Sequence, residues 1–158
     1  MRQFNETLDL KIERVLAAPP ALVWRAWTEP ELLKKWFAPR PVQTPVAEIE
    51  PVPGGHFRTV MVLPDGTEHD ESGCILAAEP GRRIAFTDGL LAGWRPAGGG
   101  FMTAVIDMVP EGAGTRYTAW VLHKSPEDRE KHEAMGFFDG WGSAIGQLDE
   151  VATGLRDG

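Results

Sequence analysis

Cysteine is almost absent from this chain, since Cys74 is the only one among 158 residues. A single cysteine cannot form a disulfide within the chain, and such usage is typical of the reducing cytoplasm. Long apolar runs are absent as well, and none approaches the roughly 20 residues that a membrane-spanning helix needs. The N-terminal stretch is too charged for the apolar centre of an export signal. We therefore expect a cytoplasmic protein that does not insert into a membrane.

Basic residues are in the minority, with 16 Lys and Arg against 23 Asp and Glu, which gives a formal net charge of −7. This balance excludes a broad basic face for nucleic acid, and we expect no nucleic-acid partner. Tyrosine occurs once, whereas the chain has six Trp and seven Phe. These large rings need an interior or a ligand to pack against. The length favours a single domain over residues 1–158.

The N-terminal part predicts one strand followed by two short helices. Residues 7–16 alternate between apolar and charged side chains, which is the period of a half-buried strand. Residues 20–28 begin with proline and carry apolar side chains at helical spacing, and residues 31–37 repeat this pattern. We expect the rings on these helices to form walls of a groove: Trp24, Trp27, Trp36 and Phe37.

The middle of the chain predicts a series of strands joined by Gly- and Pro-containing turns. Their regular spacing favours an antiparallel meander over parallel crossover units. Residues 89–100 are too rich in glycine for a regular element and predict a long loop, whose Trp94 we expect to cover an opening. The expected strands are residues 46–52, 56–63, 68–78, 83–87, 101–109 and 115–123.

The C-terminal part predicts one long helix from Ser125 to about Leu155. Ser, Pro and acidic residues at its start are typical of a helix N-terminus. The large apolar side chains from Phe137 onward fall within about 140° of arc, while His132 lies opposite Trp141 and is expected to face solvent. Four glycines inside this helix, at positions 136, 140, 142 and 146, indicate either a kink, a close partner or mere tolerance by packing.

These elements predict an α+β fold in two layers. The apolar stripe of the long helix is best buried against the concave face of a curved antiparallel sheet of about seven strands. Because such a sheet is strongly twisted, a straight helix cannot fill the groove along its whole length. We therefore expect a cavity between sheet and helix.

Five segments in this order form a recognisable pattern: APPALVWRAWTEPELLKKWFAP at 18–39, GGHFR at 54–58, the run at 73–108, GTRYTAWVLH at 114–123 and HEAMGFFDGWGSAIGQL at 132–148. In these segments the chain resembles the START-like, helix-grip superfamily (SRPBCC), and within it the bacterial family named after the activator of heat-shock-protein ATPase. This resemblance implies the helix-grip fold with a hydrophobic cavity under the C-terminal helix. Relatives bind lipids, hormones or polyketides, and some cyclise or hydrolyse them, so it also implies a polyketide cyclase-like protein. The inherited family name does not by itself predict chaperone activity.

Signals for catalysis and metal binding are weak. The four histidines and the single cysteine do not have metal-ligand spacing, and we expect no metal and no cofactor. None of the three serines lies in a nucleophile elbow, and the run of glycines at 98–100 lacks the residues of a phosphate-binding loop. The catalytic residues, if any, are unknown.

The strand patterns bring several candidate residues to one face of the sheet. Tyr117 and His123 are expected to face the helix, and Asp88 to lie near a rim. These three side chains form either a small polar cluster that orients an apolar ligand or the polar end of an ordinary core. The candidate ligand-binding residues are Phe86, Asp88, Trp94, Met102, Tyr117, His123, Met135, Phe138 and Trp141.

Three functions agree with these patterns. The first is a carrier or sensor that binds a small hydrophobic molecule between sheet and helix. The second is an enzyme on a similar substrate, with His123, Asp88 or Tyr117 as acid or base. The third is an interaction module, a homodimer or a chaperone-associated protein, which uses the glycine-rich back of the helix at residues 136–146.

Overall fold

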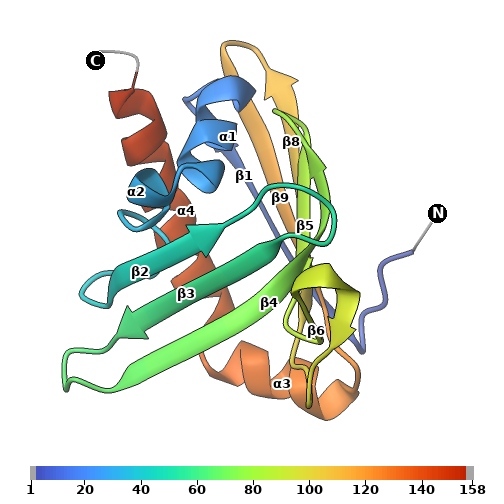
Figure 1. The fold of residues 1–158 in the computed structure, drawn as a ribbon. Coiled ribbons are helices and arrows are strands. Elements are labelled where there is room, and N and C mark those ends of the chain that lie inside the picture. Colours follow the sequence, from blue (N-terminus) through green and yellow to red (C-terminus); the bar gives the residue numbers. More distant parts are fainter. Residues whose placement is uncertain (1–2, 156–158) are drawn as a thin grey trace.

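A computed structural model describes residues 3–155 and shows a curved antiparallel sheet with helices packed on one of its faces (Figure 1). Strand β1 comes first, helices α1 and α2 follow, and the remaining strands lead to helices α3 and α4. The predicted α+β architecture is confirmed. The bounds are β1 Asp9–Leu16, α1 Pro20–Thr28, α2 Pro30–Leu33, β2 Gln43–Ile49, β3 His56–Val62, β4 Glu68–Glu79, β5 Arg83–Thr87, β8 Thr103–Glu111, β9 Gly114–Leu122, α3 Pro126–Ala134 and α4 Phe137–Gly154.

The main sheet has seven strands in the order β1-β9-β8-β5-β4-β3-β2, and all neighbours are antiparallel. From β2 to β9 this order is the expected meander, apart from a short excursion between β5 and β8. Strand β1 then pairs with the last strand, with Asp9 opposite Leu122 and Leu16 opposite Thr115. The first and last strands of the chain are therefore joined at one edge of the sheet.

The core lies between the sheet and the helices. On β8 and β9 alternate side chains are buried, as the period of two predicts, including Ile106, Met108, Tyr117 and Val121. Trp27 of α1 is buried against this layer. None of the helices within residues 3–155 has the length and apolar character needed to span a lipid bilayer.

The prediction of a single C-terminal helix is wrong. Helix α3 ends at Ala134, and α4 begins at Phe137 after Gly136, whose φ of 89° lies in the left-handed region. A side chain strains this conformation, whereas glycine adopts it freely. In Figure 1 α3 lies at the end of the sheet and α4 runs behind it. Because the helix axis changes at Gly136, positions before and after it do not share one helical wheel.

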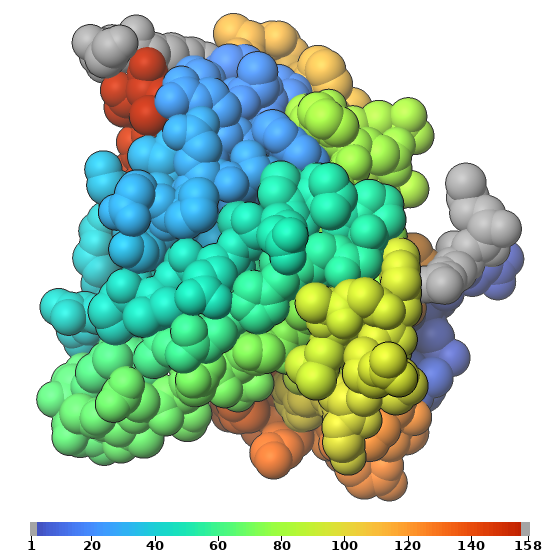
Figure 2. All heavy atoms as spheres, in the orientation of Figure 1, coloured from blue at the N-terminus to red at the C-terminus, as the bar shows by residue number. Residues whose placement is uncertain are grey.

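The prediction of a structureless loop at residues 89–100 is also wrong. The segment forms a small hairpin of β6 (Leu90–Leu91) and β7 (Arg95–Pro96) around a single turn of 3-10 helix, Ala92–Trp94. Figure 2 shows it in yellow on the surface beside β3 and β4. A Cβ on Gly54 would meet the Trp94 indole at 2.8 Å, so the ring packs directly on that glycine.

Candidate functional site

An apolar cavity of about 330 Å³ lies between helix α4, helix α1, the segment after α2 and the sheet. Phe86 and Tyr117 contribute from strands β5 and β9, and Trp141 contributes from α4. Another part of the wall comes from α1 and the segment after α2, through Trp27, Trp36 and Phe37.

The aromatic wall is tightly packed. The ring centroids of Trp27 and Trp36 are 5.0 Å apart, and those of Trp27 and Phe86 are 5.7 Å apart. The indole nitrogen of Trp27 donates a hydrogen bond of 2.8 Å to the hydroxyl of Tyr117. Both side chains are buried, and burial raises the pKa of Tyr117, so the phenol stays neutral. The wall is therefore preformed and contains one hydrogen-bonded polar pair.

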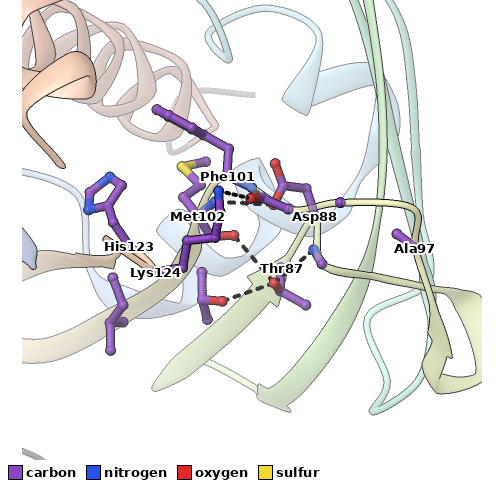
Figure 3. A pocket seen from close by; sticks show the side chains of 12 residues that line it. Thr87, Asp88, Ala97, Phe101, Met102, His123 and Lys124 are labelled. Atoms are coloured by element: carbon purple, nitrogen blue, oxygen red, sulfur yellow. Dashed lines mark hydrogen bonds between the residues drawn. The ribbon is translucent and has the colours of Figure 1, made fainter. Parts of the chain in front are cut away.

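A second hollow, which we call the outer groove, has a volume of about 410 Å³ and lies beside the β5–β8 connection. It has a more polar lining, which includes Asp88, His123 and Lys124 (Figure 3). One carboxylate oxygen of Asp88 accepts hydrogen bonds from the backbone amides of Phe101 and Met102, at 2.8 and 3.1 Å. Asp88 thus fixes the start of the chain that leads into β8.

A pair of buried histidines connects the two hollows. His123, directly after β9, lines the outer groove, and His132 of α3 lines the apolar cavity. Nε2 of His123 and Nδ1 of His132 are 2.9 Å apart, and Nδ1 of His123 is 2.8 Å from the carbonyl oxygen of Leu8. Burial, together with the neighbouring His123, lowers the pKa of His132 to about 4. His132 is therefore neutral at physiological pH.

The predicted site residues divide between the two hollows. Met102 borders both, Asp88 and His123 line only the outer groove, and Trp94 and Phe138 line neither of them. Trp94 does not cover the cavity, because it packs at the turn before β3. The predicted residues that line the apolar cavity are Phe86, Met102, Tyr117, Met135 and Trp141.

The proposed polar cluster of Asp88, Tyr117 and His123 does not form. Tyr117 and His123 are six residues apart along one extended segment, which separates them by about 20 Å. Tyr117 bonds to Trp27, whereas His123 bonds to Leu8 and His132. Asp88 and His123 therefore share the outer groove, whereas Tyr117 lies apart from them at the apolar cavity.

His132 is the residue that sequence reasoning places wrongly. The helical wheel predicts a side chain in solvent, yet only 8% of the residue is exposed. The wheel fails here because Gly136 breaks the helix between His132 and Trp141, whose rings approach to 6.2 Å. The spacing around His132 gives no signal of burial, since the rest of α3 is strongly polar.

The glycines of the C-terminal segment do not form one shared surface. Gly140 lines the cavity, whereas a Cβ on Gly142 would lie 3.8 Å from Ile12 of β1. Gly146 is exposed, and a Cβ there would meet nothing within 4 Å. A homodimer through this helix back stays a prediction, as does a chaperone partner.

Metal-binding residues are not gathered into a site in the described part of the chain. Within residues 3–155, no group of three or more His, Cys, Asp or Glu side chains is placed to hold a metal ion. The histidine pair supplies only two such side chains. Both ring nitrogens of His123 and Nδ1 of His132 are already hydrogen-bonded within the protein.

The sequence and the fold of this chain are similar to those of known proteins. A family model described as Activator of Hsp90 ATPase homolog 1-like protein matches residues 17–153. The chain belongs to this family. The predicted membership in the helix-grip superfamily is therefore confirmed, while a comparison with curated protein sequences returns no match.

Solved structures of similar proteins support this Activator of Hsp90 ATPase homolog 1-like assignment over nearly the whole chain. A crystal structure of a Nitrosomonas europaea protein is 44% identical, covers 98% of this chain and 100% of that chain, and has a TM-score of 0.95. A Mycobacterium smegmatis structure is 28% identical with a TM-score of 0.80 and covers 98% and 96% of the two chains. One from Rhodobacter sphaeroides is 25% identical with a TM-score of 0.82 and covers 97% of each chain.

Proposed function

We propose that this protein binds a small hydrophobic molecule in the apolar cavity between α4 and the sheet. The supporting observation is a preformed cavity of about 330 Å³ whose walls are mainly apolar and include seven Phe, Trp and Tyr side chains. Ligand sites are typically concave, mostly apolar spaces of about 300–1,000 Å³ with a few placed polar groups. We place this role in the cytoplasm, in agreement with the scarcity of cysteine.

The entrance of the cavity agrees with this role. Met135 lies at the break between α3 and α4, lines the cavity and is 68% exposed. Its flexible thioether side chain adapts to irregular apolar ligands. Phe138 is next to this break and packs on Phe137 with ring centroids 5.0 Å apart. We infer that a ligand enters beside Met135.

The test is a substitution on α4 that fills the cavity and leaves the residues of the sheet unchanged. Gly140 lines the cavity and has open space around its missing Cβ, so Gly140→Leu places an apolar side chain there. The fluorescent probe N-phenyl-1-naphthylamine should bind the unmodified protein, and Gly140→Leu should weaken this binding by about tenfold or more. The measurement is the rise of probe fluorescence during a titration.

The matched control is Gly146→Leu, which adds the same side chain to an exposed position of the same helix. This variant should bind the probe as the unmodified protein does. Equal loss of binding in both variants, or no effect of Gly140→Leu, would contradict the cavity as the binding site.

A further inference from the structure

The hydrogen bonds of the buried histidine pair fix where its protons lie. The carbonyl oxygen of Leu8 accepts from both the backbone amide and Nδ1 of His123, at 3.1 and 2.8 Å. A carbonyl oxygen only accepts hydrogen bonds, so Nδ1 of His123 must carry a proton. In the neutral ring, Nε2 of His123 then has a free lone pair.

This lone pair determines the tautomer of His132. Because Nε2 of neutral His123 accepts, Nδ1 of His132 must donate across the 2.9 Å between them. His132 is itself neutral, with a pKa lowered to about 4 by burial and by His123. Its own Nε2 therefore carries no proton and is a hydrogen-bond acceptor.

That acceptor has no partner among residues 3–155. His132 is more than nine-tenths buried, and its ring packs 5.1 Å from Phe101 and 5.1 Å from Phe137. The same ring lines the apolar cavity, and its Nδ1 is bonded to His123. Within residues 3–155, Thr44 Oγ1 is the only side-chain nitrogen or oxygen that is both fully shielded and unpaired. Nε2 of His132 is therefore open to the space beside it, and a donor on a ligand can reach it.

We propose that Nε2 of His132 recognises a hydrogen-bond donor on the ligand, so the ligand is an apolar molecule with a neutral hydroxyl group. This inference rests on the proposed function, because it assumes that the cavity is the binding site. Because Nε2 of His132 only accepts hydrogen bonds in this tautomer, the cavity favours ligands that donate one. An ether, ketone or ester of the same shape presents only acceptors and leaves Nε2 unpaired.

The test compares 2-naphthol with 2-methoxynaphthalene, which differ in the hydroxyl proton that His132 would accept. Both are titrated by calorimetry at about pH 8, where an ordinary imidazole is neutral. One buried hydrogen bond predicts that 2-naphthol binds about tenfold more tightly. In His132→Phe, which keeps a ring but removes the acceptor, the two affinities should agree within about twofold.

The control is His69→Phe, the same substitution at an exposed position on β4, which should keep the full preference. If the methyl ether binds as tightly as the alcohol, the inference is wrong and the proposed function stands. The same follows if His132→Phe keeps the preference. If neither compound binds the unmodified protein, the cavity is not the site and both proposals fail.

A second measurement reports the positioning role of His123. Nitrogen NMR of the histidine side chains should show His132 protonated at Nδ1, with 2-naphthol shifting its Nε2 resonance. In His123→Phe, Nδ1 of His132 loses its acceptor, so the tautomer should change and the preference for 2-naphthol should shrink. A proton on Nε2 of His132 in the unmodified protein would overturn the inference.

Discussion

Two buried polar side chains, Tyr117 of β9 and His132 of α3, border the apolar cavity. The hydroxyl of Tyr117 accepts a hydrogen bond from Trp27, and burial raises its pKa, so it stays neutral. His132 is bonded at one nitrogen only. The tautomer that we infer leaves the other nitrogen as an acceptor without a proton.

The lowered pKa of His132 predicts acid sensitivity. In the unfolded chain the imidazole takes up a proton near its ordinary pKa of 6.5, whereas in the folded protein it does so near 4. The unfolded state binds more protons between these values, so the free energy of unfolding falls as the pH falls from 6.5 to 4. We expect His132 to account for about 3 kcal/mol of this loss.

The measurement is urea unfolding across this pH range for the unmodified protein, His132→Phe and the exposed control His69→Phe. His132→Phe should show a flatter dependence on pH, while His69→Phe should follow the unmodified protein. Identical slopes for all three proteins would show that His132 does not titrate as its burial predicts.

At the scale of elements, the break between α3 and α4 is the decisive feature. It lets α3 turn across the end of the sheet, where Arg129 donates a hydrogen bond of 3.2 Å to the carbonyl oxygen of Asp9. It also places His132 among aromatic rings, with the centroids of Phe101 and Phe137 each 5.1 Å away. A continuous helix would carry His132 away from this position.

The left-handed backbone at Gly136 predicts that replacing glycine by alanine changes the free energy of unfolding in opposite directions at positions 136 and 146. Gly136→Ala should lower the free energy of unfolding by about 1 kcal/mol, because a Cβ strains a φ of 89°. Gly146→Ala should raise it by up to about 1 kcal/mol, because alanine favours a helix interior and nothing there opposes its Cβ. Urea unfolding measures both, and shifts of the same sign would contradict this account.

At the scale of the whole molecule, α4 holds the two layers together by polar contacts as well as by its apolar stripe. Asp149 accepts hydrogen bonds from the backbone amides of Ala17 and Ala18, at 2.9 and 3.0 Å. Gln147 is buried and bonds to the segment between α2 and β2. This segment supplies part of the cavity wall, so the same helix positions both the core and the site.

Gln147 gives a prediction at this scale. Its amide donates to the carbonyl oxygens of Trp36 and Ala38 and accepts from the backbone amide of Arg40. Gln147→Leu leaves these groups without their partner and should lower the free energy of unfolding by about 3 kcal/mol. The same change at the exposed Gln43 should stay within about 0.5 kcal/mol. Chemical denaturation checks both, and equal losses would contradict the role of Gln147.

The strands and their buried faces were predictable because period-two alternation is a local property of the sequence. Strand β5 has the predicted bounds, and the inward side chains of β8 and β9 are those that alternation indicates. The candidate site was predictable only in part. Met102, Tyr117 and Trp141 line the cavity, but Trp94 does not. The direction of a surface hairpin depends on distant contacts, such as that of Trp94 with Gly54.

The sequence by itself determined the order of elements, the antiparallel sheet and the apolar stripe of the last helix, because each follows from patterns over a few neighbouring residues. Only the tertiary structure decided that His132 is buried, bonded to His123 and placed at the cavity. That outcome requires a change of helix direction at Gly136 and the approach of β9 and α3. Such contacts join residues whose relation no local period encodes, and they supply the polar feature of an otherwise apolar site.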